Sequence, residues 1–310
     1  MSRFGYSKED LMRAPSRKRA TVIQAVGGYA NTGIAVVQGL LLIPLYLHYI
    51  GAHMYGLWLA SGGMLGMLGM VNFGISSMLI QRIANAYGKQ DLARAGAYFI
   101  NGMSVYIGIC LLLGLIGWVI SLWLPQILHV KDADAGLLEA CFQLAVAAMA
   151  IGIFNECLRS IGQALLRPVV PIAGMIVGRI LGVGVTIWLL VDGFGLWAIP
   201  TGTLVAEGLI FVVNLLNAIS LVSALGSKIK LEWAIIREYL RTSPALFMAT
   251  VGNTVSQQSE PVLITMLTSP EMTTVYMVTR RAADIVFQSL SVIYGSVLSS
   301  LSHLVGTTNR

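Results

Sequence analysis

Charged residues are scarce in this sequence. Asp, Glu, Lys and Arg make up 11% of the 310 residues, against about 25% in soluble domains, and hydrophobic residues make up 56%. The stretches 20–81 and 95–130 contain none of the four charged types. Each stretch is longer than the ~20 apolar residues that a membrane-spanning helix needs. The composition therefore excludes a soluble globular protein and predicts an all-α integral membrane protein with several transmembrane helices.

Cysteine and histidine are scarce as well. The cysteines Cys110, Cys141 and Cys157 are odd in number and lie inside apolar runs, so we expect no disulfide framework. No two of the four histidines share a helix face at metal-ligand spacing, and the sequence lacks a phosphate-binding loop, a nucleophile elbow and a zinc-helix motif. We therefore expect no metal, no cofactor, no nucleic-acid partner and no enzymatic activity. Binding and conformational change are the chemistry that remains.

The apolar stretches divide into about eight predicted transmembrane spans. They cover roughly residues 22–48, 55–80, 96–124, 137–158, 168–191, 196–222, 244–267 and 272–300. We predict a six-helix N-terminal lobe with a cytoplasmic tail (1–222), a cytoplasmic amphipathic linker (223–243) and the first two helices of an incomplete C-terminal lobe (244–310). The linker is predicted because apolar residues recur in it at helical spacing. These residues are Ile229, Trp233, Ile236 and Leu240.

Lysine and arginine are distributed unequally between the two ends of these spans. The N-terminal tail, the even-numbered loops and the C-terminal stub together hold 16 of them, whereas the odd-numbered loops hold only Lys131. Positive loop residues favour the cytoplasmic side of a membrane. The net charge of +6 is therefore explained by the membrane topology, and both termini are predicted to be cytoplasmic.

Two ionisable residues lie at similar depth in neighbouring predicted spans. Arg179 is about 16 Å into span 5, and Glu207 is about 15 Å from the outer face in span 6, at 1.5 Å per residue. A charged side chain at the centre of a bilayer costs ~2.5–3.5 kcal/mol and usually faces a bundle interior or a wet cavity. Two interpretations remain open: an ion pair that holds spans 5 and 6 together, or a cavity wall that binds substrate or a coupling cation.

Span 8 carries three further ionisable residues. Arg280 and Asp284 are four residues apart and can form an ion pair on one helix face. Arg281 has no such local partner, so it must reach another helix, water or an anion. Arg281 is therefore a candidate for substrate binding.

Other candidates lie in span 7 and at cytoplasmic helix ends. Glu260 precedes Pro261, and a carboxylate beside carbonyls freed by proline suits a proton or Na⁺ site, or a structural role. Arg82 and Arg159 lie at cytoplasmic helix ends, where they either snorkel to the interface or form a cationic mouth for phosphate. The full candidate set is Arg82, Arg159, Arg179, Arg280 and Arg281 for substrate, and Glu207, Glu260 and Asp284 for ion coupling.

The first two spans carry a recognisable pattern of residues. It runs through Gln38, Pro44, Gly51, Tyr55-Gly56-Leu57-Trp58, Asn72-Phe73-Gly74-Ile75 and Arg82-Ile83-Ala84. This pattern resembles the start of the polysaccharide-biosynthesis flippases, which export lipid-linked oligosaccharides and O-antigen and share a superfamily with the multidrug-and-toxin extruders. The rest of the chain resembles them in helix count and loop length.

The resemblance implies a fold of two six-helix lobes around a central cavity, which opens alternately to each side of the membrane. It implies undecaprenyl-pyrophosphate-linked sugar as the substrate, with the pyrophosphate held by cavity arginines, of which Arg82 matches the span 2 pattern. Relatives have roughly twelve to fourteen spans, so the chain is expected to be C-terminally truncated. The lack of an acidic residue in span 1 favours the oligosaccharide branch.

The predicted function is thus a flippase of the bacterial cytoplasmic membrane for surface polysaccharide, lipopolysaccharide or O-antigen synthesis. The expected partners are the lipid-linked oligosaccharide, membrane lipids, H⁺ or Na⁺ as coupling ion, and polysaccharide assembly proteins. Two alternatives remain open: a cation-coupled multidrug or metabolite extruder of the same fold, and a membrane glycosyltransferase or polymerase or an inert truncated remnant. The outer loops, at most about a dozen residues long, leave little room for the acid and base groups of an enzyme.

Overall fold

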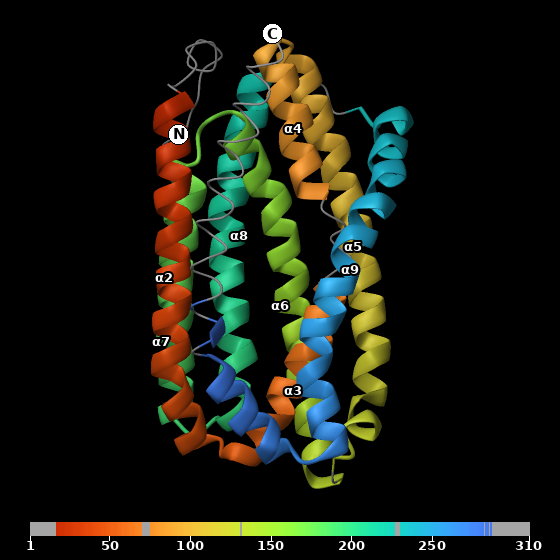
Figure 1. Ribbon diagram of the computed structural model, residues 1–310. Helices are drawn as coiled ribbons and strands as arrows, with labels where there is room; N and C mark the ends of the chain where they lie inside the picture. Colours follow the sequence, from red (N-terminus) through yellow and green to blue (C-terminus); the bar gives the residue numbers. More distant parts are fainter. Residues whose placement is uncertain are drawn as a thin grey trace.

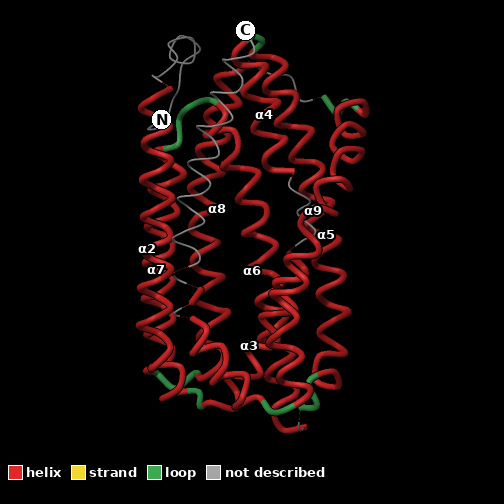
Figure 2. Tube along the Cα trace, viewed as in Figure 1, coloured by secondary structure: helices red, strands yellow, loops and turns green. Residues whose placement is uncertain are grey.

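A computed structural model describes residues 17–69, 75–130, 132–226, 230–281, 283, 284 and 286 (Figure 1). Its elements are α2 (Arg17–Tyr49), α3 (Ala52–Leu68), α4 (Ile75–Gly88), α5 (Leu92–Ile127), α6 (Asp132–Ala164), α7 (Val169–Val191), the short 3₁₀ helix η2 (Gly195–Trp197), α8 (Ala198–Leu225) and α9 (Trp233–Leu267). Residues 270–281 form a further helical stretch. Figure 2 shows helices and short loops throughout these ranges, and they contain no strand.

Five helices of the described ranges are long and apolar enough to cross a membrane. They are Val22–Tyr49, Leu92–Ile127, Asp134–Ala164, Val169–Val191 and Gly195–Leu225. These helices contain the predicted spans 1 and 3–6. Large apolar side chains on their outer surfaces are exposed, including Leu111 at 71% and Trp188 at 60%. Such a surface fits lipid rather than water, and the chain is a multi-pass membrane protein.

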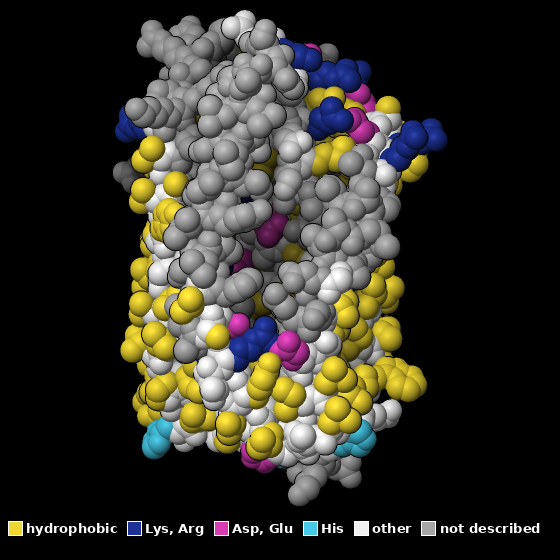
Figure 3. All heavy atoms as spheres, viewed as in Figure 1, with side chains coloured by type: hydrophobic (Ala, Val, Ile, Leu, Met, Phe, Trp, Pro, Cys, Tyr) yellow, Lys and Arg dark blue, Asp and Glu magenta, His cyan; other side chains and the backbone are white. Residues whose placement is uncertain are grey.

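The helices form two groups with α6 between them. In Figure 1, α2, α7 and α8 lie on one side, and α3, α4, α5 and α9 lie on the other, with α6 contacting α5 and α8. Most of the Lys and Arg side chains visible in Figure 3 gather at the end where α2 and α9 begin. This is the end that the loop charges predict to be cytoplasmic.

Glycine permits two sharp chain reversals and one close helix pair. Gly51 between α2 and α3 and Gly226 after α8 have φ of 85° and 65°, a backbone region that other residues rarely adopt. In α7, Gly174, Gly178 and Gly182 face α8, and an ideal Cβ at Gly178 would lie 2.5 Å from Cγ1 of Ile210. The small-residue row predicted in span 5 therefore lets α7 and α8 pack closely.

Two predicted boundaries differ from the structure. The predicted span 55–80 is divided between α3, which ends at Leu68, and α4, which begins at Ile75. The predicted linker helix and span 7 are one helix, because α9 continues without a break through residue 243. The division into lobes stays a prediction. Of the predicted span 8, residues 287–300 lie outside the described residues.

The start of α9 is fixed by a buried asparagine of α5. Nδ2 of Asn101 donates to the Lys230 carbonyl oxygen at 3.1 Å, and Oδ1 of Asn101 accepts from the Glu232 backbone N–H at 2.7 Å. Ile235 and Tyr239 are the buried apolar residues of this turn, whereas Trp233 is 69% exposed. The face predicted from Trp233 and Leu240 is therefore the exposed face, as suits a helix in contact with lipid headgroups.

Candidate functional site

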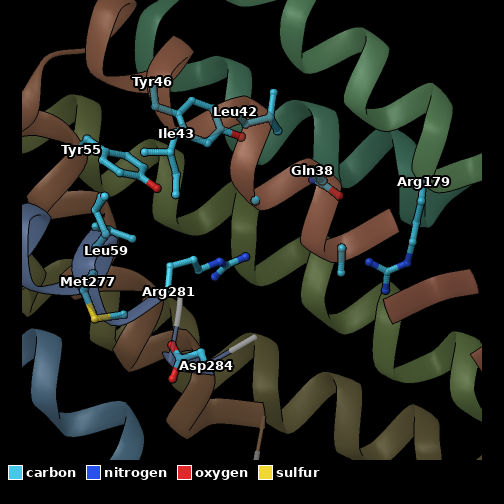
Figure 4. A pocket seen from close by; sticks show the side chains of 13 residues that line it. Gln38, Leu42, Ile43, Tyr46, Tyr55, Leu59, Arg179, Met277, Arg281 and Asp284 are labelled. Carbon is cyan, nitrogen blue, oxygen red and sulfur yellow. The ribbon is translucent and has the colours of Figure 1, made fainter. Parts of the chain in front are cut away.

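Two cavities lie between the helices. The smaller, of about 310 Å³, is enclosed by α2, α3, α7 and residues 277–284 (Figure 4). The larger, of about 630 Å³, is enclosed by α2, α3, α6, α7 and α8. Arg179 lines both cavities, so they adjoin at its side chain.

Arg281 is the second arginine of the smaller cavity. Its guanidinium lies against α2, where an ideal Cβ at Gly39 would be 2.6 Å from Nη2. Among the described residues Arg281 has no ion pair and no hydrogen bond. In Figure 4 the guanidinium groups of Arg281 and Arg179 point toward one another across the cavity. The pair of tyrosine rings, Tyr46 and Tyr55 with centroids 5.2 Å apart, lines the same cavity.

Of the two interpretations left open for Arg179 and Glu207, the ion pair is not formed in the described part of the chain. Glu207 accepts hydrogen bonds from Nδ2 of Asn155, at 2.9 Å to Oε2 and 3.0 Å to the backbone oxygen. The buried Nε of Arg179 has no hydrogen-bond partner within the described part of the chain. The physical reason is the direction of the side chain. Gly178 and Gly182 contact α8, and Arg179 is turned by about 100° from Gly178 on the same helix, away from α8 and toward the cavities.

Arg280, in contrast, is paired with carboxylates. The predicted pair with Asp284 is confirmed, with Nε of Arg280 3.1 Å from Oδ1 of Asp284. Nη1 of Arg280 also forms an ion pair with Oε2 of Glu260, which accepts a hydrogen bond from the hydroxyl of Tyr276 at 2.9 Å. These contacts join α9 to the helix that follows it. The Arg280 guanidinium is therefore paired with carboxylates of the protein itself.

The two arginines predicted at cytoplasmic helix ends lie in different surroundings. Arg82 of α4 forms an ion pair with Glu238 of α9 and lines neither cavity. Arg159 of α6 lines the larger cavity, with Nη1 3.8 Å from the sulfur of Met175. The structure therefore gathers Arg159, Arg179 and Glu207 around the larger cavity, and Arg179, Arg281 and Asp284 around the smaller one.

Sequence reasoning missed three neutral residues. Asn31, Asn155 and Asn214 line the larger cavity, and each has a buried side-chain oxygen without a hydrogen-bond partner in the described residues. The signal was present, because an amide side chain within an apolar span is itself expensive to bury. Only charged residues were weighed at that depth.

At the opposite end, which the loop charges predict to be the outer one, the start of α3 contacts the helical stretch 270–281 that follows α9. Nδ1 of His53 lies 2.6 Å from Oε1 of Glu271, and the hydroxyl of Thr274 donates to the Ala52 carbonyl oxygen at 2.7 Å. The hydrogen bond from His53 lowers the pKa of Glu271 to about 2, helped by bonds from the Glu271 backbone and Ser269. These contacts join the start of α3 to the helical stretch that follows α9.

A metal centre is not formed by the described residues, which contain no group of three His, Cys, Asp or Glu side chains arranged to hold an ion. The polar groups that line the cavities include guanidinium, carboxylate, carboxamide and hydroxyl groups. Such a set can bind an anion and a hydroxyl-rich ligand by ionic and hydrogen bonds.

Comparison with known proteins gives a fold and a family. A solved structure described as "Crystal structure of MATE in complex with MaD3S" superposes with a TM-score of 0.58 at 14% sequence identity, covering 90% of this chain and 68% of that chain. This similarity shows a MATE-like fold. A search of the curated proteins found no match. A family model described as "Polysaccharide biosynthesis protein" matches residues 67–307. The chain therefore belongs to the polysaccharide biosynthesis protein family.

Proposed function

We propose that this chain acts in moving undecaprenyl-pyrophosphate-linked oligosaccharide across the bacterial cytoplasmic membrane, for surface polysaccharide or O-antigen synthesis. The observation that carries the proposal is the smaller cavity, in which the guanidinium groups of Arg179 and Arg281 face one another without a carboxylate partner among the described residues. Family membership supports a transporter of polysaccharide precursors.

A pyrophosphate group is the anion that suits this pair of arginines. Guanidinium binds phosphate oxygens through two parallel hydrogen bonds, and an unpaired arginine inside a membrane protein is costly unless an anion or water meets it. Among the described residues, the only carboxylate that lines the smaller cavity is Asp284, which accepts a hydrogen bond from Arg280. Arg179 and Arg281 are therefore left to bind the phosphates.

The other candidate residues take secondary roles in the proposed mechanism. Arg82 and Arg159 provide positive charge where the lipid headgroup arrives from the cytoplasmic leaflet, and the pair of Arg82 with Glu238 has to open if Arg82 contacts phosphate. Glu207, Glu260 and Asp284 are candidates for binding H⁺ or Na⁺. A cation at Glu260 or Asp284 would compete with Arg280 and loosen its contacts.

The proposed transport cycle is alternating access. The pyrophosphate binds between the two groups of helices while the prenyl chain stays in the lipid. Opening of the outer contacts, which include His53 with Glu271, then releases the oligosaccharide outside. Because the cycle involves binding and movement alone, it needs no catalytic residue.

The test is a leaflet assay in cells that lack this gene. Lipid-linked oligosaccharide is expected to accumulate in the inner leaflet, and expression of residues 1–310 is expected to relieve the accumulation. Accumulation without relief would assign transport to a longer protein. Normal distribution of the lipid in the deleted strain would contradict the proposal and favour the drug-extruder alternative, which is tested by drug sensitivity.

A further inference from the structure

The larger cavity differs from the smaller one in charge. Arg159 and Arg179 are balanced in formal charge by Glu156 and Glu207, whereas the smaller cavity has two arginines against Asp284. An anion is therefore favoured in the smaller cavity and a neutral polar group in the larger one. The two cavities share Arg179, so one extended ligand can occupy both.

The polar surface of the larger cavity is rich in hydrogen-bond acceptors. The side-chain N–H₂ group of Asn155 donates to Oε2 and to the backbone oxygen of Glu207, which turns Oδ1 of Asn155 away from Glu207. This oxygen and the side-chain oxygens of Asn31 and Asn214 are buried and have no donor in the described residues. Asn155 is 5% exposed and Asn214 is 1% exposed. Buried acceptors of this kind are costly unless a ligand or water supplies the donors.

The geometry points to the larger cavity as the binding site for the sugar part of the transported lipid. Sugar hydroxyls supply the donors that the three carboxamide oxygens lack. Trp58 lines the same cavity and offers a ring for the apolar face of a sugar. This inference rests on the proposed function, which places the pyrophosphate beside Arg179 in the smaller cavity. It assigns the glycan to the adjoining larger cavity.

A cation is the competing occupant, because carboxylate and carboxamide oxygens also bind Na⁺. Two features of the cavity oppose a cation there. Its volume of about 630 Å³ is far larger than an ion needs, and the guanidinium groups of Arg159 and Arg179 line it. Neither the volume nor the guanidinium groups disfavour a neutral ligand that is rich in hydroxyl groups.

Among the described residues, those that line the larger cavity belong only to α2, α3, α6, α7 and α8, and they lie between positions 31 and 214. The smaller cavity also takes Met277, Val278, Arg281 and Asp284 from the helix after α9. The sugar site therefore stays whole when that helix moves relative to the others, and the phosphate site does not.

The experiment compares the binding of two lipids to the purified 310-residue chain by native mass spectrometry. One lipid is bare undecaprenyl pyrophosphate, and the other is the lipid-linked oligosaccharide extracted from the expressing cells. We expect Asn214→Leu to weaken binding of the oligosaccharide lipid about tenfold and to leave the bare lipid unchanged, because a sugar hydroxyl loses the carboxamide oxygen that accepts its hydrogen bond. Asn31→Leu, at a less buried position on α2, should show the same pattern.

The matched control is Asn217→Leu. Asn217 lies on α8 as Asn214 does, is also 1% exposed and also has an unpartnered carboxamide in the described residues, but it does not line the cavity. We expect this variant to bind both lipids as the unmodified protein does. An equal effect of Asn214→Leu and Asn217→Leu would overturn the inference.

Three other outcomes also count against the inference, for different reasons. If Asn214→Leu and Asn31→Leu weaken the binding of both lipids equally, the site does not recognise the sugar. A change in Na⁺ dependence, with the preference between the lipids intact, would assign the cavity to a cation. Failure of the unmodified chain to bind either lipid would reject the proposed function, and the sugar site with it.

Discussion

At the scale of single residues, the arginines of the predicted transmembrane spans differ in whether they form an ion pair with a carboxylate. Arg280 is held by Glu260 and Asp284, whereas Arg179 and Arg281 have no carboxylate partner among the described residues. A paired arginine stabilises the fold, and an unpaired one is available to a ligand. In the proposed function, the same residue type thus serves two purposes within one helix turn of span 8: Arg280 stabilises the fold, and Arg281 binds the ligand.

Replacement of Arg281 by alanine is expected to reduce lipid transport by more than about 100-fold, because two charge-assisted hydrogen bonds to phosphate are lost. Arg281→Lys should retain part of the activity, since it keeps the charge but loses the two-pronged contact. The measurement is the leaflet assay at equal membrane levels of protein. Arg94→Ala is the control, because Arg94 is exposed at the start of α5 and lines neither cavity. Normal transport by Arg281→Ala would remove Arg281 from the site.

Replacement of Glu260 by glutamine is expected to destabilise the protein instead. The side chains of Arg280 and Glu260 are 23% and 36% exposed, so their pair lies between a surface and a buried ion pair, and we expect a loss of about 2 kcal/mol. Thermal unfolding in detergent measures it. The double variant with Arg280→Gln should recover part of the loss, and strictly additive effects would argue against a direct pair.

The sequence predicted some of these roles but not others. The Arg280–Asp284 pair follows from a spacing of four on a helix, which needs no tertiary information. For Arg179 and Glu207 the sequence left an ion pair and a cavity wall both open, because equal depth does not fix the direction of a side chain around its helix. The orientation of the Asn155 amide depends on Glu207 of another helix, and so no local pattern could reveal it.

At the scale of helices, close packing of α7 on α8 depends on small residues. Gly178→Leu is expected to lower the free energy of unfolding by about 1–3 kcal/mol, because the new side chain would overlap Ile210 and the Ala206 backbone. The control is Gly184→Leu on the same helix, where a Cβ would meet nothing within 4 Å. Thermal unfolding of the two variants in detergent compares them. Equal unfolding temperatures of the two variants would show that close packing of α7 on α8 does not contribute to stability.

The positions of the long helices could be predicted from hydropathy, whereas their interruptions could not. Spans 1 and 3–6 lie where long apolar stretches predicted them. The division into α3 and α4 and the continuation of α9 past residue 243 are set by contacts with other helices, such as those of Asn101 with the chain before α9. Tertiary contacts of this kind override local pattern.

At the scale of the whole molecule, the outer contact between His53 and Glu271 is expected to make stability depend on pH. The pKa of Glu271 is lowered from 4.5 to about 2, so the carboxylate contributes stability above pH 4.5, and this contribution declines as the pH falls toward 2. The melting temperature of Glu271→Gln should therefore fall less than that of the unmodified protein across this range. The effect is small because both side chains are about half exposed.

The control for this measurement is Asp192→Asn, which alters an exposed carboxylate in another outer loop that forms no ion pair in the described structure. Its melting curve should follow that of the unmodified protein. A parallel fall of all three proteins would show that the outer contact contributes nothing to the acid sensitivity.

Every described residue that lines the larger cavity, the proposed sugar site, lies between positions 31 and 214, and this has a consequence for how new specificities arise. A recognition site encoded in one continuous segment can be inherited and exchanged as a unit. Recombination between related genes near the start of α9 would pass a complete recognition site from one lineage to another, joined to a different transport partner. Strains that change their surface glycan could acquire a matching exporter in one such event.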